Sequence, residues 1–464
     1  ETCAAIANVF WNYRLFLTHG EAKYMDIVER SMYNNVLSGI SLEGNKFFYP
    51  NRLESRGGVE RSEWFNVSCC PTNITRFIPS VPGYIYATKD DELYVNLYIS
   101  SQAGVELNST PLTLIQDSDL PWGGRVSISL DTEKDVYFKL RARLPAWASD
   151  RPVTSDLYSF EKNVSESPQI RVNNSIIEYT VVDGYMLIDR VWNKGDRVDI
   201  TFPFEIRKLH AHDSVLANRG KVALQAGPLV YAAEWPDQED GKVLNLVLDD
   251  KNDLSFGSAE IMGNRIMTIE GSGRSLKLNR DESLESKKVD ITAVPYFAWA
   301  HRGDREMAVW IPIRDEAAVP LHYPTIASES RIEASHPKAQ LKSIQDHRIP
   351  ENSGSREETN FNWWPLKDTT GWISYEFAKP ERISECEIFW FTDAYRGGGV
   401  GMPESWKICY RKGNIWLPVT AVSDYEIKKD EISRVRFEAV RTDALRLEVL
   451  MGEKSAGLYE WTVK

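Results

Sequence analysis

The chain has 464 residues, which at about 150 residues per domain predicts about three domains and excludes a single small disulfide-stapled module. Its 55 basic and 67 acidic residues give a net charge of −12, which argues against nucleic acid or an anionic membrane surface as the main partner. Five cysteines are too few for a disulfide framework, and their odd number leaves at least one thiol unpaired within the chain. No stretch reaches the roughly 18 consecutive apolar residues of a membrane span, so the composition indicates a globular protein.

Helical patterns open the chain. Two runs of apolar residues recur at three- and four-residue spacings, and a break at residues 18–20 separates them. This pattern predicts an antiparallel helical hairpin over residues 4–38. Glycines and scattered charges predict a long loop over residues 41–68, and the proline-containing segment 78–85 predicts a last, kinked helix.

After residue 88 the pattern changes to the period of two that β-strands show. Many short strand patterns, bounded by Gly, Asp, Asn and Pro, follow one another, and they are more than one sandwich holds. We therefore expect two β-sandwich domains, over residues 89–208 and 209–328, and a third β segment over residues 329–464. No fixed-period repeat and no low-complexity tract interrupts these segments.

Four side chains in two short motifs form the strongest candidate for a chemical site. Glu1 and Cys3 open the chain, and Cys69 and Cys70 begin the sequence Cys-Cys-Pro-Thr-Asn. Three thiolates and one carboxylate complete the four-coordinate shell that Zn²⁺ prefers. We expect Glu1 and Cys3 in an extended lead-in, which points both side chains to one side. The adjacent pair can reach the same ion if its loop turns sharply at the proline that follows.

Two other interpretations of these cysteines stay open. They can be ordinary buried thiols, or Cys3 can form a disulfide with one of the adjacent pair. If a metal is bound, its thiolates are already deprotonated and one of them could act as a nucleophile. His210 and His212 alternate on a strand pattern, which is more simply read as a solvated loop. Nucleotide-binding, serine-hydrolase and zincin motifs are not found in the sequence.

Several longer segments resemble one enzyme family. The resemblance is carried by ETCAAIANVFWNYRLF, NRLESRGGVERSEWFNVSCCPTNITRF, RGKVALQAGPLVYAAEW and YFAWAHRGDREMAVWIPI. These segments resemble the β-L-arabinofuranosidases of glycoside hydrolase family 127 and the related family 146, over about residues 1–313. The resemblance implies a multidomain fold, in which an (α/α)6 barrel is followed by mainly antiparallel β-sandwich domains. Residues 1–88 would be the C-terminal helices of that barrel.

The resemblance also implies a reaction and the residues that carry it. The enzyme would be a retaining glycoside hydrolase that releases L-arabinose from β-L-arabinofuranosides, with an arabinofuranosyl glycan as its substrate. Glu1, Cys3, Cys69 and Cys70 would bind Zn²⁺. Cys69 would attack the anomeric carbon, which departs from the scheme of two carboxylates. Tyr49, in the sequence FFYPN, matches a substrate-binding tyrosine of the family.

Glu29 also matches the family, but its place on a helix predicts a solvated glutamate. One feature departs from the family pattern. The acid/base glutamate of the family lies upstream of the Glu-x-Cys motif, in a part that this sequence does not include. We therefore expect the N-terminal half of the same enzyme, with most of the barrel helices, to be missing from this chain and to cover its apolar helix faces.

From about residue 331 the sequence resembles a discoidin-like domain, also called a coagulation factor 5/8 type C domain. The resemblance is carried by SIQDHRIPENSGS, NWWP, GWISYEF, MPESWKICYRK and SAGLYEWTV. Such domains often bind carbohydrate at loop tips, so the alternative function is a non-catalytic carbohydrate-binding protein. The cellular compartment stays open, and a periplasmic or secreted location in a bacterium is favoured. At least one of Trp363 and Trp364 is expected in the core, since neighbours on a strand point opposite ways. Cys386 and Cys409 are expected in the core as well.

Overall fold

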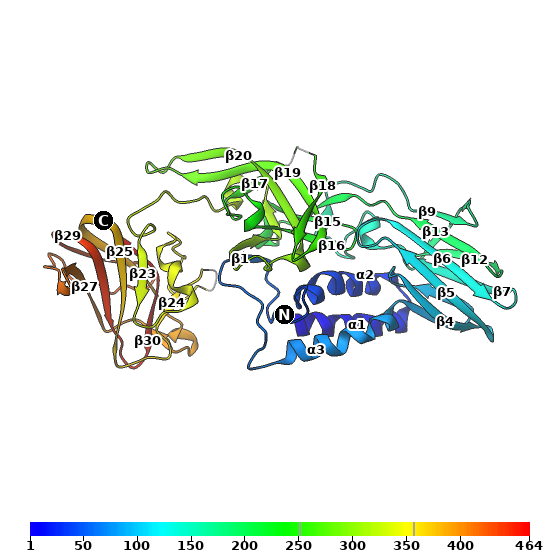
Figure 1. Cartoon of the computed structure of the whole chain (residues 1–464), viewed down its shortest axis with the longest axis horizontal. Coiled ribbons are helices and arrows are strands. Elements are labelled where there is room, and N and C mark those ends of the chain that lie inside the picture. The colour runs from blue at the N-terminus through cyan, green and yellow to red at the C-terminus, as the bar shows by residue number, and fades with distance from the viewer. Residues whose placement is uncertain (250, 252, 356–357) are drawn as a thin grey trace. The chain divides into compact units, whose positions relative to one another are not determined.

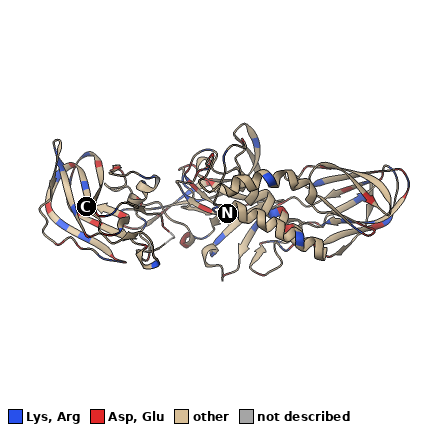
Figure 2. Ribbon diagram, turned by 90° about the horizontal axis from the view of Figure 1, so that it is seen from below, with Lys and Arg blue, Asp and Glu red and all other residues tan. Residues whose placement is uncertain are grey.

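The computed structural model describes residues 1–249, 251, 253–355 and 358–464. They form two compact units (Figure 1). Unit 1 holds residues 1–277 and 284–321, and unit 2 holds residues 278–283 and 322–464. Residues of both charge signs occur within each unit (Figure 2), so the negative net charge is not confined to a separate acidic segment.

Helices occupy the start of unit 1, and α1 packs against both α2 and α3 (Figure 1). Their bounds are α1 (Thr2–His19), α2 (Ala22–Arg30), the π-helical turn η1 (Ser31–Val36), α3 (Cys69–Phe77) and the 3-10 turn η2 (Ile78–Tyr84). The predicted hairpin break is confirmed at Gly20, whose left-handed backbone (φ 73°) ends α1. The last helix was predicted too late in the chain. Its α-helical part begins at Cys69, and the proline segment is the 3-10 turn.

A β-sandwich follows in unit 1. One sheet has the strand order β10-β9-β13-β6-β5-β4 and the other β11-β12-β7-β3-β2. The bounds are β2 (Tyr86–Lys89), β3 (Glu92–Val95), β4 (Ser101–Leu107), β5 (Thr110–Ser118), β6 (Arg125–Thr132), β7 (Val136–Arg143), β9 (Gln169–Val172), β10 (Ser175–Ile177), β11 (Thr180–Val182), β12 (Tyr185–Trp192) and β13 (Arg197–Thr201). Alternate residues such as Leu112, Leu114, Ile128 and Phe138 form a shared core.

A larger sheet completes unit 1 and reaches back to the helical segment. Its central order is β17-β19-β20-β16-β15-β14-β8, and β1 joins through β21. The bounds are β1 (Glu54–Arg56), β8 (Tyr158–Phe160), β14 (Ile206–Ala211), β15 (Lys221–Ala226), β16 (Leu229–Glu234), β17 (Leu246–Leu248), β18 (Ser255–Ile261), β19 (Asn264–Leu278), β20 (Leu284–Pro295), β21 (Glu306–Ala308) and β22 (Trp310–Pro312). The pairing of β1 with β21 fixes the long loop of residues 41–68 to this sheet.

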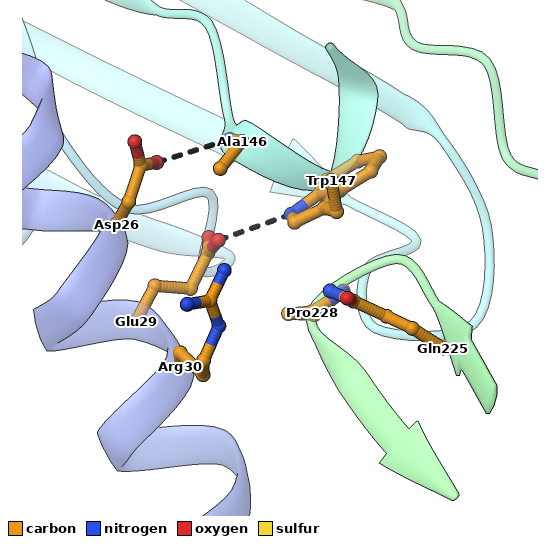
Figure 3. A pocket seen from close by; sticks show the side chains of 7 residues that line it. All are labelled: Asp26, Glu29, Arg30, Ala146, Trp147, Gln225 and Pro228. Carbon is orange, nitrogen blue, oxygen red and sulfur yellow. Dashed lines mark hydrogen bonds between the residues drawn. The ribbon is translucent and has the colours of Figure 1, made fainter. Parts of the chain in front are cut away.

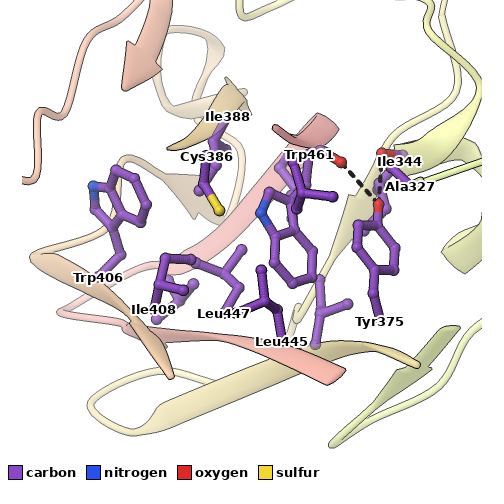
Figure 4. Packing of buried hydrophobic residues seen from close by; sticks show 14 of the residues in the cluster. Ala327, Ile344, Tyr375, Cys386, Ile388, Trp406, Ile408, Leu445, Leu447 and Trp461 are labelled. Carbon is purple, nitrogen blue, oxygen red and sulfur yellow. Dashed lines mark hydrogen bonds between the residues drawn. The ribbon is translucent and has the colours of Figure 1, made fainter. Parts of the chain in front are cut away.

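Unit 2 is built on one antiparallel ladder, to which β26 adds a parallel pair. Its strands are β23 (Arg331–Ala334), β24 (Phe361–Asn362), β25 (Thr370–Phe391), β26 (Val400–Gly401), β27 (Ser405–Lys412), β28 (Ile415–Pro418), β29 (Ile432–Leu450) and β30 (Ser455–Val463). The register between β25 and β29 shifts twice, and such bulges bend long strands. The core holds Tyr375 stacked on Trp461, with Cys386 beside them (Figure 4).

The core predictions for unit 2 are confirmed. Trp363 is buried, whereas its neighbour Trp364 is 57% exposed. Cys386 and Cys409 are both buried. The predicted multidomain and mostly β fold class is confirmed, but an (α/α)6 barrel is not seen. In the described part of the chain the α-helices are α1, α2 and α3, and none of these helices has the length and hydropathy needed to cross a membrane.

Candidate metal and active site

The two predicted motifs meet at one point in unit 1. One ligand atom from each of Glu1, Cys3, Cys69 and Cys70 can be chosen so that all four lie within 4.8 Å of one another. The sulfurs of Cys3 and Cys70 are 3.3 Å apart, and those of Cys69 and Cys70 are 3.8 Å apart. Ligands held about 2.3 Å from a tetrahedral metal lie about 3.8 Å from one another. The four groups therefore have the chemistry and the spacing to hold one metal ion.

The backbone around these ligands differs from the prediction. Glu1 is the N-cap residue of α1, and Cys3 already lies within that helix, not in an extended lead-in. Cys69 and Cys70 are the first two residues of α3, not part of a turning loop. Successive helical residues are separated by about 100° around the axis, which still lets both sulfurs reach one ion. The proline that follows fits the first helical turn, where its missing N–H is not needed.

Helix N-termini give the site its electrostatic character. Both ligand pairs lie at a helix start, where unpaired N–H groups carry partial positive charge and favour thiolates. Burial acts in the opposite direction: it raises the pKa of the Cys70 thiol to about 12 and also raises the pKa of Cys3. A bound cation reverses this effect, because it stabilises the thiolate directly. All five cysteines of the chain are free thiols, so the disulfide interpretation is wrong for this structure.

The start of α1 is held by the loop that precedes β1. The Thr2 hydroxyl donates to the carbonyl of Phe48 at 2.8 Å, and its backbone N–H donates to the carbonyl of Tyr49 at 3.1 Å. Gly39 lies against the same threonine. A Cβ at that position would be 2.5 Å from Thr2 Cγ2, which is closer than real atoms approach. A residue without a side chain is therefore required for the first turn of α1 to dock, and with it Cys3.

Tyr49 lies at the edge of this site. The negative charge of Glu1, followed by that of Cys69, raises the pKa of its hydroxyl, which places the phenol beside the ligand set. The ring of Phe65 packs edge-on against it, with the centroids 6.1 Å apart. The side chain is 38% exposed. It is therefore available to a ligand as well as close to the sulfurs.

Glu29 is not the solvated residue that its helix position predicted. It is buried in unit 1, where it pairs with Arg143 and accepts a hydrogen bond from the Trp147 indole at 3.0 Å (Figure 3). Asp26, one turn earlier, pairs with the same arginine and accepts from the backbone N–H of Ala146 at 3.1 Å. Burial raises the pKa of both carboxyls, and the arginine opposes that shift. This cluster fixes α2 to the first sandwich.

Sequence reasoning missed one contact of the site. The side-chain amide of Asn73, in the first turns of α3, donates to the sulfur of Cys3 at 3.1 Å. This residue is not among the site residues predicted from the sequence. The signal that could have found it is the helical spacing, since a residue four positions after Cys69 lies on the same helix face.

Comparisons with known proteins show to which enzyme family the chain belongs. Three family models match consecutive parts of the chain: "Beta-L-arabinofuranosidase, GH127 catalytic domain" at residues 1–83, the GH127 middle domain at residues 92–204, and the "Glycoside hydrolase family 127 C-terminal domain" at residues 206–312. The chain belongs to glycoside hydrolase family 127.

Individual relatives agree with this class. A non-reducing end β-L-arabinofuranosidase from Bifidobacterium longum is 28% identical and covers 67% of this chain and 48% of its own length. A solved GH127 β-arabinofuranosidase is 40% identical, with a TM-score of 0.66, over 69% of this chain and 50% of that chain. A GH127 β-L-arabinofuranosidase from Geobacillus stearothermophilus T6 is 33% identical, with a TM-score of 0.61, over 67% and 49%. The chain thus spans about half the length of the relatives that it matches.

Proposed function

We propose that this chain is part of a retaining glycoside hydrolase that releases L-arabinose from β-L-arabinofuranosides, with Cys69 as nucleophile and Zn²⁺ as cofactor. The observation that carries the proposal is the convergence of three sulfurs and one carboxylate within 4.8 Å. It occurs in the segment that matches the catalytic-domain model. Relatives described as β-L-arabinofuranosidases support the choice of sugar.

Each residue of the cluster has a separate role in this proposal. Glu1, Cys3, Cys69 and Cys70 would hold Zn²⁺, which when bound supplies the positive charge that keeps buried sulfurs deprotonated. Cys70 is completely buried, whereas Cys3 and Cys69 are both partly exposed. Burial therefore argues against Cys70 as the nucleophile, and of the other two sulfurs Cys69 is the one that the resemblance to the family implies. Tyr49 would contact the substrate at the open edge of the cluster.

The reaction proceeds by two displacements. The Cys69 thiolate attacks the anomeric carbon, so that a C–S bond forms as the glycosidic C–O bond breaks, and the leaving oxygen takes a proton from a glutamic acid. Water, deprotonated by the same glutamate, then attacks the anomeric carbon and displaces the sulfur. Two inversions retain the configuration. We place this glutamate in the N-terminal half of the same enzyme, outside residues 1–464.

The N-terminal half is also the partner proposed for the helices. Phe10, Trp11 and Leu17 of α1 are exposed, although they are large and apolar. The matched part of the chain accounts for about half the length of each relative, which leaves room for further barrel helices against that face. In the proposed domain organisation residues 1–88 complete the barrel, residues 89–208 and 209–328 form two β-sandwich domains, and residues 329–464 form a discoidin-like domain.

The test is release of L-arabinose by the enzyme extended to the length of its relatives. Cys69→Ala should abolish release, because it removes the attacking sulfur. The control is Cys409→Ala, which removes a thiol in unit 2 and should leave the release of L-arabinose unchanged. Metal analysis should find one zinc per chain. Full turnover by Cys69→Ala, or a protein without zinc, would refute the assignment.

A second candidate function concerns unit 2, as a carbohydrate-binding module. The supporting observation is the exposed ring of Trp364, which lies beside Gly399. The loop that contains this glycine also carries Tyr395, which is 62% exposed, and exposed aromatic faces suit sugar stacking. Loss of glycan binding in Trp364→Ala of the intact chain would support a binding role. A protein that binds glycans but releases no arabinose would favour the non-catalytic alternative.

A further inference from the structure

The three sulfurs of the cluster differ in the contacts that they make. Cys3 receives the N–H···S hydrogen bond of Asn73 at 3.1 Å. Cys70 is completely buried and contacts both other sulfurs. In the described part of the chain, Cys69 meets other sulfurs but no nitrogen or oxygen donor within hydrogen-bond distance. The surroundings are therefore unequal even though the three side chains are chemically the same.

We propose that Asn73 is a positioning residue that fixes Cys3 as a non-reacting ligand and thereby leaves Cys69 as the reactive sulfur. The inference rests on the proposed function, since it explains which thiolate attacks. An N–H group that donates to a thiolate withdraws electron density from it, and a sulfur with less density is a weaker nucleophile. The hydrogen bond also holds the Cys3 side chain in one direction, which is toward Cys70.

Helix packing holds Asn73 close to Cys3. Asn73 is four residues after Cys69 on α3, so the same helix presents the reactive sulfur and the amide that binds a different sulfur on α1. The contact therefore also joins the two helices at the metal site. Phe10 and Phe77 form an edge-to-face pair between the same two helices, with ring centroids 5.8 Å apart, so the amide is held by helix packing rather than by a free loop.

The experiment compares the reactivity of the individual cysteines with zinc bound. The intact protein is treated with limiting iodoacetamide, and the alkylated cysteines are identified by peptide mass mapping, with zinc content measured in parallel. Wild type should be alkylated first at Cys69. Asn73→Ala should raise the rate at Cys3 relative to Cys69 by about threefold to tenfold, which corresponds to the net free energy of one ordinary hydrogen bond. Asn73→Gln, which keeps the amide, should recover part of the difference.

Arg76→Ala is the matched control, because this exposed residue lies on the same helix and contacts no cysteine in the described residues. If a variant loses zinc, cobalt substitution provides a second measurement: the sulfur-to-cobalt absorption bands should shift in Asn73→Ala and much less in Asn73→Gln. An unchanged ratio of Cys3 to Cys69 alkylation, or unshifted cobalt bands, would overturn the inference. A shifted ratio in a protein that releases no arabinose would overturn the proposed function alone.

Discussion

Replacement of Arg143 by methionine gives the sharpest test of how unit 1 is held together. The guanidinium is completely buried and pairs with Asp26 and Glu29, whose side chains are 19% and 4% exposed. Methionine keeps much of the apolar volume but removes the cation that pairs with both carboxylates, and leaves Arg30 as the remaining positive charge beside them. Removal of one partner of a buried ion pair costs about 3–5 kcal/mol. We expect about 4 kcal/mol, because Trp147 and Ala146 continue to donate to the two carboxyls.

The loss should depend on pH in a defined direction. In the wild type, burial raises the pKa of both carboxyls and Arg143 offsets part of the increase. Without the arginine both values rise further. A carboxyl whose pKa is higher in the folded than in the unfolded state stabilises the fold at low pH, and this contribution is lost as pH rises through the folded value. The variant should therefore be closer to wild type at pH 5 than at pH 8.

Urea denaturation followed by tryptophan fluorescence measures this difference at both pH values. The control is Arg125→Met, the same change at an arginine that is 83% exposed and pairs with Asp119 at 3.1 Å. That variant should lose less than about 0.5 kcal/mol, since exposed pairs contribute little. An Arg143→Met protein within about 0.5 kcal/mol of wild type at pH 8 would show that this cluster does not hold the helices to the sandwich.

Three further outcomes are expected. Gly39→Ala should displace Thr2 and weaken zinc binding by about tenfold, at a stability cost of about 1–3 kcal/mol. The control Gly83→Ala, where no atom lies within 4 Å of the added carbon, should change neither zinc affinity nor stability. Equal zinc affinities of the two variants would contradict the argument that Gly39 lets α1 dock. Trp363→Ala should lower the free energy of unfolding of unit 2 by about 3–5 kcal/mol, whereas Trp364→Ala should change it by less than about 1 kcal/mol, as measured by chemical denaturation. Chelation should lower the melting temperature of unit 1, and Zn²⁺ but not Mg²⁺ should restore it; full recovery with Mg²⁺ would exclude a thiolate site.

The sequence predicted the elements that depend on local pattern. The end of α1 at Gly20, the change to strands after residue 88, and the core position of Trp363 follow from periodicity and turn chemistry. The start of α3 did not follow, because Ser-Cys-Cys-Pro-Thr-Asn is rich in turn-forming residues. The same letters also fit a helix N-terminus, in which serine occupies the N-cap position and proline the first turn.

Long-range partners limited the prediction of the site. The four candidate ligands were named from thiol and carboxylate chemistry together with the resemblance to the family, and the structure brings them together. Glu29 was misjudged, since its partner Arg143 is 114 positions away and belongs to a strand. A helix pattern shows which face is apolar, but it cannot show that an arginine from a distant strand will neutralise a carboxylate on it. The hydrogen bond from Asn73 to Cys3 depends in the same way on how two helices pack.

The ligand geometry has a consequence for chain entropy. Cys3 and Cys70 are 67 positions apart, so an ion bound to both acts as a removable cross-link around the helical hairpin and the loop of residues 41–68. Closing a loop of that length in the unfolded chain corresponds to roughly 4 kcal/mol in the entropy model used for disulfides. A disulfide would give a similar constraint but would consume the sulfurs. In the proposed mechanism a metal would close the same loop and leave one sulfur able to form and release a bond, so availability of the ion would control persistence of the fold and turnover together.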